Sequence, residues 1–123
     1  MRTTLAILFT FVLGLAATSA LADEAKLKTI AALYKDKAAL AGKEVRVQGK
    51  VVKVNNGIMG RNFVHVQDGT GDKESNDVTV TSKQTANVGD QVTVTGRVLL
   101  NKDFGAGYAY PLLLEEASIS AKK

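Results

Sequence analysis

After Gly42, apolar residues, most of them valine, alternate with polar ones along several short segments. A period of two places successive side chains on opposite faces of an extended strand, so it predicts strands with one buried face. The segments between them are rich in glycine, asparagine and aspartate, which are typical of turns. The sequence therefore predicts a mainly β domain with five strands, at 45–54, 63–67, 78–81, 91–100 and 108–114, and the pattern of the last can be followed to 119.

Two of the predicted strands carry the same pattern. The segment GKEVRVQGKV at 42–51 aligns without gaps with GDQVTVTGRV at 89–98, and each has a glycine, Gly49 or Gly96, inside the strand. Glycine inside a strand marks a bulge, a sharp bend or the close approach of another backbone. Two long bent strands, three shorter ones and tight turns predict a five-stranded Greek-key barrel of the OB type over about 43–119.

Residues 24–40 have a helical period instead. Leu27, Ile30 and Leu33 belong to an apolar stripe, lysines occupy the other face, and Gly42 is expected to end the helix. Many OB domains have a helix between the third and fourth strands, but the segment 82–90 is too short for one. We therefore expect this N-terminal amphipathic helix to cover an open end of the barrel.

The first 22 residues have the layout of a secretory signal peptide. Arg2 precedes an apolar run over 5–17, and Ala20 and Ala22 form an A-x-A site, so cleavage is expected after Ala22. The apolar run is shorter than the roughly 20 residues of a membrane-spanning helix. The mature chain, 23–123, is therefore expected in the periplasm as a single domain without a membrane span. Its net charge is the +4 of the full chain less the charge of Arg2, or +3.

Composition excludes several classes of function. The chain contains no cysteine, which excludes thiolate metal sites and cysteine nucleophiles. His65 is its only histidine and has no recognisable catalytic partner set, so a non-catalytic protein is expected. Asp68 and Asp72 lack the ligand spacing of an EF-hand and are expected to be turn residues. The glycine-rich segments lack the P-loop pattern.

Two longer runs resemble a known family. LAGKEVRVQGKVVKVNNGIMGRNFVHVQDGTGD, followed by VGDQVTVTGRVLLNKDFGAGYAYPLLLEEASI, is similar to the NrfJ-like small periplasmic OB-fold proteins. The resemblance covers nearly all of the mature chain. It implies an OB barrel with an N-terminal helix in the periplasm, a fold often described as nucleic-acid-binding or DNA-binding. It also implies an accessory place in periplasmic cytochrome respiration of the nitrite reductase type.

Ligands of OB barrels meet the face of the second and third strands and two loops, which join strands one to two and four to five. In this sequence those loops are predicted at 55–61 and 101–107. We expect a binding module that takes a ligand or a protein partner there. The candidate binding residues are Met59, Arg61, Phe63, His65, Lys102, Phe104 and Tyr108.

Single-stranded nucleic acid is one alternative ligand. The positive charges are spread along the chain, whereas nucleic-acid-binding domains usually have a basic stripe. Alternation places Tyr108 and Tyr110 on the face of Leu112 and Leu114, which predicts core packing for both tyrosines. Phosphate contacts would come from Lys50, Lys53, Arg61, Arg97 and Lys102, and base stacking from Phe63, Phe104, Tyr108 and Tyr110.

Copper is a second alternative. Met59 offers a soft thioether and His65 an imidazole, a pairing that suits copper. Two ligands do not make a tight site, so Asp68, Asp72 or a second chain would have to complete it. The competing interpretation is that Met59 packs across the barrel mouth and His65 lies on a half-exposed strand face.

Overall fold

The computed structural model of the protein describes residues 25–105 and 107–121. The predicted signal peptide lies outside these residues. Within the described residues, no helix is both long enough and apolar enough to cross a membrane. The elements in chain order are β1 (Lys26–Leu27), α2 (Ile30–Lys35), α3 (Lys37–Leu40), β2 (Glu44–Ile58), β3 (Arg61–Gln67), β4 (Val78–Ser82), β5 (Gln91–Asp103) and β6 (Ala109–Ala121). The prediction of a mainly β chain is confirmed.

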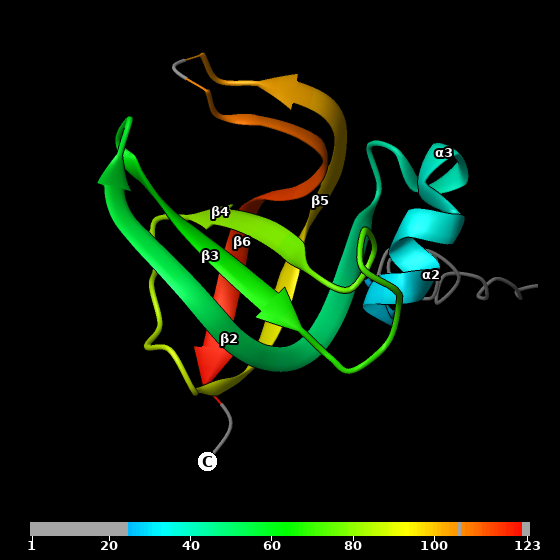
Figure 1. The fold of residues 1–123 in the computed structure, drawn as a ribbon, viewed down its shortest axis with the longest axis horizontal. Helices are drawn as coiled ribbons and strands as arrows, with labels where there is room; N and C mark the ends of the chain where they lie inside the picture. The colour runs from blue at the N-terminus through cyan, green and yellow to red at the C-terminus, as the bar shows by residue number, and fades with distance from the viewer. Residues whose placement is uncertain (1–24, 106, 122–123) are drawn as a thin grey trace, which may run out of the picture.

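The strands form one sheet in the order β1-β2-β3-β4-β6-β5, and β2 also pairs with β5. The β1–β2 and β4–β6 pairs are parallel, and the other pairs are antiparallel. The first half of the long, curved β2 pairs with β5 and the second half pairs with β3 (Figure 1). The pairings that start at β2 and pass through β3, β4, β6 and β5 therefore return to β2.

The two similar segments of the sequence pair with each other. Val47 lies opposite Val94, and on either side of this pair Gly49 lies opposite Val92 and Val45 opposite Gly96. Each glycine thus faces a valine of the other segment, as in a local two-fold arrangement. Both glycines lie where other chain segments come close, as the sequence predicts.

Gly49 marks the tighter of these two approaches. A Cβ atom at this position would lie 2.6 Å from the carbonyl oxygen of Gln67 and 2.8 Å from Cγ1 of Val66. At Gly96 the nearest atoms would be the Cβ atoms of Ala117 and Leu114, at 3.0 and 3.1 Å. The bend of β2 over β3 therefore requires the absence of a side chain at Gly49.

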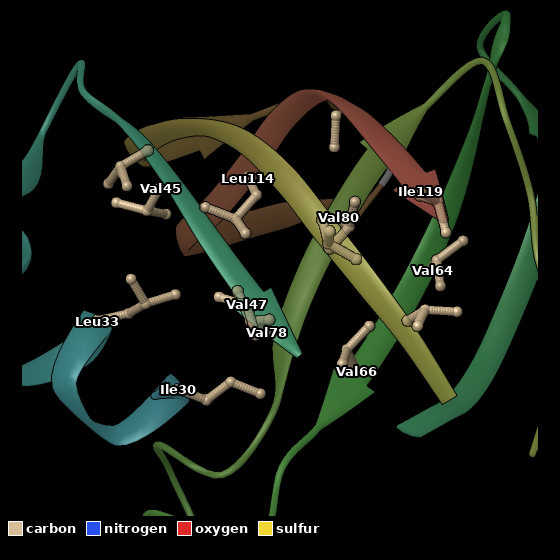
Figure 2. Packing of buried hydrophobic residues seen from close by; sticks show 14 of the residues in the cluster. Ile30, Leu33, Val45, Val47, Val64, Val66, Val78, Val80, Leu114 and Ile119 are labelled. Atoms are coloured by element: carbon tan, nitrogen blue, oxygen red, sulfur yellow. The ribbon is translucent and has the colours of Figure 1, made fainter. Parts of the chain in front are cut away.

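The main core lies inside the circuit of strands and consists mostly of valines (Figure 2). Ile30 and Leu33 of α2 point into it and are fully buried. Val64 and Val66 of β3 also belong to it, so the alternate residues Phe63 and His65 lie on the outer face of β3. The buried members are Ile30, Leu33, Val45, Val47, Val51, Val64, Val66, Val78, Val80, Val92, Val94, Val98, Leu112, Leu114, Ala117 and Ile119.

The prediction of a single helix over 24–40 is wrong. Residues Lys26–Leu27 form a short strand beside β2, and the helical part is divided at Asp36 into α2 and α3. The start of α2 is fixed by three side chains that accept hydrogen bonds from its first amides. Thr29 Oγ1 accepts from Ala32 N at 3.1 Å, and Asp68 Oδ2 accepts from Ile30 N at 2.9 Å.

The third of these acceptors is Thr70 Oγ1, 3.0 Å from Ala31 N. Asp68 therefore has a structural role beyond that of a turn residue, because it caps a helix far away in the sequence. Burial alone would raise the pKa of Asp68, but hydrogen bonds from the Thr70 hydroxyl and from the Ile30 and Thr70 amides outweigh this effect and lower it.

The predicted loops are shorter than expected. β2 continues to Ile58 with an irregular register after Asn55, so only Met59 and Gly60 separate it from β3. Likewise, β5 runs to Asp103 and β6 begins at Ala109. The predicted loops 55–61 and 101–107 are thus the tips of two β hairpins, both on the side of the molecule away from the helices (Figure 1). The segment between β4 and β5 contains no helix, as predicted.

Candidate functional site

Four aromatic side chains from the two hairpins meet on the outer face of β3. The ring of Phe63 lies 5.3 Å from that of Phe104, 5.5 Å from that of Tyr108 and 5.9 Å from that of Tyr110, measured between centroids. Phe104 and Tyr110 are also 6.3 Å apart. These distances are typical of stabilising aromatic pairs. We call Phe63, Phe104, Tyr108 and Tyr110 the aromatic cluster.

The aromatic cluster is separate from the valine core. Phe63 is fully buried although it does not belong to that core. By register it lies opposite Thr81, and the next row of the same face holds Thr79 opposite Leu113. All three of these neighbours are buried as well. The outer face of the sheet is therefore covered at these four positions, and the rings of the β5–β6 hairpin pack on Phe63.

The predicted core packing of Tyr108 and Tyr110 is wrong. Leu112 is a member of the valine core, but the two tyrosines pack on Phe63 instead. β4 pairs with β6 only at Leu113 and Leu114, so the part of β6 before Leu112 pairs with β5 alone and extends beyond β4. Strand twist turns their side chains toward the outer face of β3. Burial, followed by the proximity of Tyr108 and Asp77, raises the pKa of Tyr110.

Two cations contact the ring at the hairpin tip. The guanidinium carbon of Arg61 lies 5.0 Å and the ammonium nitrogen of Lys102 5.2 Å from the centroid of Phe104. Both distances fall within the range of cation–π attraction. Among the residues that the structure describes, neither cation forms an ion pair with a carboxylate. The structure thus brings Arg61 of the β2–β3 hairpin to Lys102 and Phe104 of the β5–β6 hairpin.

His65 lies two residues beyond Phe63 on the same face of β3. Its Nδ1 atom is 3.1 Å from Asp77 Oδ1 and 3.4 Å from Thr79 Oγ1. The backbone carbonyl of Asp77 accepts a hydrogen bond of 2.6 Å from the Tyr34 hydroxyl, which ties this position to α2. His65 is therefore held in place by its neighbours on the half-buried strand face that the sequence predicts. The partnership with Asp77 has no local sequence signal, because it spans a long turn.

Met59 occupies the turn between β2 and β3. Its backbone is left-handed, with φ of 53°, and the residue is 45% exposed, which disagrees with the interpretation that Met59 packs across the barrel mouth. Arg61 and His65 are separated by roughly 13 Å of extended strand at about 3.3 Å per residue, and Met59 lies beyond Arg61. Within the described parts of the chain, no three histidine, aspartate or glutamate side chains gather as metal ligands. The copper site at Met59 and His65 stays a prediction.

The remaining basic candidates are dispersed. Lys53 shares the outer face with His65 by register. Lys50 lines a separate surface cavity of about 380 Å³ together with Gln48, Gln67 and Asp68. Arg97 donates a hydrogen bond of 3.1 Å to the carbonyl oxygen of Gly42. The five predicted phosphate contacts therefore do not form one continuous track.

The sequence matches no family model and no curated protein. Among solved structures, the chain is similar to an aspartyl-tRNA synthetase-like chain from Leishmania major Friedlin, with a TM-score of 0.57 and 13% identity. The match covers 77% of this chain and 20% of that chain. It is also similar to a DUF3299 family protein from Pseudomonas aeruginosa PAO1, with a TM-score of 0.50 and 14% identity. That match covers 69% of this chain and 64% of that chain. At these identities the similarity concerns the fold alone.

Proposed function

We propose that the protein is a non-catalytic, exported binding module with an OB-type barrel. The circuit of pairings through β2, β3, β4, β6 and β5 supports the barrel, because an OB fold is a five-stranded Greek-key barrel. Within this circuit β4–β6 is the one parallel pair, and it closes the chain of otherwise antiparallel pairs. β1 adds a short sixth strand outside this circuit.

The module binds its ligand or protein partner through the hairpin tips 55–61 and 101–107. The observation that carries this proposal is the contact between Arg61 of one hairpin and Phe104 of the other, at 5.0 Å. It joins the two segments that OB barrels use for recognition into a single surface. Exposed Met59 extends that surface at the β2–β3 turn. An adaptable thioether beside a cation and an aromatic ring is typical of protein-binding surfaces.

The expected location is the periplasm, on the basis of the layout of residues 1–22. The resemblance to NrfJ-like proteins favours a partner among the components of periplasmic cytochrome respiration. A capture experiment with the immobilised mature chain and periplasmic extract tests this. We expect Met59→Ala combined with Arg61→Ala to lose the captured partner and Lys73→Ala, an exposed change in the loop after β3, to retain it. Retention of every partner by the double variant would contradict the proposal.

Single-stranded nucleic acid is the second candidate ligand, because Arg61 and Lys102 adjoin the partly exposed ring of Phe104. Stacking on such rings contributes about 1–3 kcal/mol per base. Fluorescence anisotropy with a short labelled oligodeoxythymidylate measures this binding. Nucleic-acid binding predicts an affinity that falls with salt and with Arg61→Ala. Absence of binding at low salt would exclude it.

A further inference from the structure

We propose that the Phe104 ring occupies a binding site for a small planar aromatic anion and moves out when that ligand binds. We call a ring in this role a placeholder. The ligand's ring takes the position of the Phe104 ring beside Arg61 and Lys102, and the ligand's negative charge pairs with those two cations. The inference rests on the proposed function, since it places the ligand at the hairpin tips. The ligand is then an aromatic anion, and the group that it displaces is the Phe104 ring.

The two cations are the first support. Arg61 belongs to β3 and Lys102 to β5, yet both lie within about 5 Å of the same ring centroid. Phe104 is neutral, so it offers them only the weak attraction of its π face. Across residues 25–105 and 107–121, no carboxylate pairs with either cation. An aromatic anion would keep the ring contact and add a charge-assisted interaction.

The floor of the site is the second support. The edge-on contact between Phe104 and buried Phe63, at 5.3 Å and 78°, defines a space that fits one flat ring. Tyr108 and Tyr110 also contact Phe63, and of the two only Tyr110 pairs with Phe104 as well, at 6.3 Å. Phe63 therefore stays covered when the Phe104 ring leaves, and a ligand ring of similar size can replace it.

The turn that carries Phe104 can keep its shape during this exchange. The Phe104 amide donates to the Tyr108 carbonyl oxygen at 2.7 Å, and the Tyr108 amide donates to that of Gly105 at 2.9 Å. Asp103 Oδ1 accepts from the Gly105 amide at 2.8 Å. These bonds involve the backbone and Asp103 but not the Phe104 ring. Rotation of that half-buried side chain about its own bonds is enough to vacate the site.

The dispersion of the other cations limits the size of the ligand. Lys50 and Arg97 lie away from the aromatic cluster, at a separate cavity and at the Gly42 carbonyl. A long strand of nucleic acid needs a basic groove that follows its backbone. Two cations around one ring instead fit a ligand with one ring and one acidic group.

The sign of the effect of Phe104→Ala distinguishes a placeholder from a platform. A placeholder competes with the ligand, so its removal tightens binding, whereas a platform contributes to binding, so its removal weakens it. The probe is 4-toluenesulfonate, with affinity measured by NMR titration of the mature chain. Because Phe104 gains two cation–π contacts when it closes on the site, we expect Phe104→Ala to bind the probe about 5- to 30-fold more tightly than wild type.

Matched probes and a second variant test the two parts of the site. Methanesulfonate lacks the ring and 4-methylbenzyl alcohol lacks the charge, so each should bind at least about tenfold more weakly than 4-toluenesulfonate to Phe104→Ala. Adding Arg61→Ala to Phe104→Ala should weaken 4-toluenesulfonate binding by about tenfold. Equal binding of all three probes would contradict the site.

Weaker or unchanged binding of 4-toluenesulfonate by Phe104→Ala would overturn the placeholder role. If the probe fails to bind while partner capture still depends on Met59 and Arg61, the proposed function stands and this inference fails. An affinity for oligodeoxythymidylate that rises with the length of the oligonucleotide would indicate a groove that binds several nucleotides. That result would contradict a site for one ring.

Phe104→Trp gives a readout that does not depend on the alanine variant. The chain contains no tryptophan, so this residue would be its only indole fluorophore. Displacement into water by 4-toluenesulfonate should shift its emission to longer wavelength. Saturation with the probe, seen by NMR, without any emission shift would contradict displacement.

Discussion

The guanidinium of Arg61 and the ring of Phe104 lie 5.0 Å apart, although one residue begins β3 and the other follows the end of β5. This contact joins the tips of two hairpins, and fully buried Phe63 lies beneath it. The molecule thus has two apolar centres. The valine core holds the circuit of strands together, and the aromatic cluster holds the β5–β6 hairpin against the outer face of β3.

Phe63→Ala should destabilise the protein by about 3 kcal/mol, the lower part of the range for a buried phenylalanine. The half-buried rings of Tyr108 and Tyr110 can partly fill the space that is left. Urea unfolding followed by far-UV circular dichroism measures the change. Val88→Ala is the control, since Val88 is 64% exposed and should change stability by less than about 0.5 kcal/mol. Equal effects of the two variants would contradict the role of Phe63.

Asp68→Asn should destabilise the protein by about 1 kcal/mol at neutral pH, because Asp68 accepts hydrogen bonds from the Ile30 amide at the start of α2 and from the Thr70 amide in its own turn. Its pKa is lowered below the ordinary 3.8. A carboxylate of this kind stabilises the fold above its unfolded pKa, and that contribution is lost as the pH falls through the folded pKa. The difference between wild type and Asp68→Asn should therefore shrink below about pH 4.

The control for this pH series is Asp36→Asn. The Asp36 side chain is exposed and makes no capping hydrogen bond, so its replacement should change the free energy of unfolding little at neutral pH. Chemical unfolding at several pH values gives both differences. A constant difference for Asp68→Asn between neutral and acidic pH would show that its ionised form is not responsible.

Gly49→Ala should destabilise the protein by about 1–3 kcal/mol, since the new methyl group would meet the backbone oxygen of Gln67 at 2.6 Å. Gly96→Ala occupies the equivalent place in the other similar segment. Its methyl group would meet side-chain atoms at 3.0 Å or more, so a smaller loss is expected. Thermal unfolding of both variants compares them. A greater loss for Gly96→Ala would contradict the close approach at Gly49.

Much of the sheet was predictable from local pattern. Alternation in the sequence identifies β2 to β6 because each strand has one face in the valine core. The similarity of 42–51 and 89–98 also anticipates two equivalent strands with interior glycines. Their mutual pairing centred on Val47 and Val94 is a tertiary property that the alignment alone does not specify.

The failed predictions concern residues whose partners are distant in the sequence. α2 begins at Ile30 because Asp68 and Thr70, from the turn after β3, accept hydrogen bonds from its first amides. Helical periodicity over 24–40 contains no information about those acceptors. Tyr108 and Tyr110 do not pack with Leu112 and Leu114 for a similar reason, since their partner Phe63 is also distant in the sequence. Alternation defines two faces of a strand, but it does not show where β6 stops pairing with β4 and extends with β5 alone.

The candidate site was predicted in part. The OB plan identifies 55–61 and 101–107 as neighbouring segments, and the structure joins them through Arg61 and Phe104. The sequence did not reveal that Phe63 is buried beneath Phe104, because both rings belong to hairpins that meet only in the folded chain. Nor did it reveal that Lys102 shares a ring with Arg61.

We propose that Arg61, Lys102 and Phe104 form one binding site. The test follows backbone amide chemical shifts of the isotopically labelled chain 23–123 during titration with 4-toluenesulfonate. The largest changes should occur at 59–63 and 102–108, with little change in α2 or around the cavity lined by Gln48 and Lys50. Changes centred on that cavity, or spread evenly over the surface, would contradict a site at the hairpin tips.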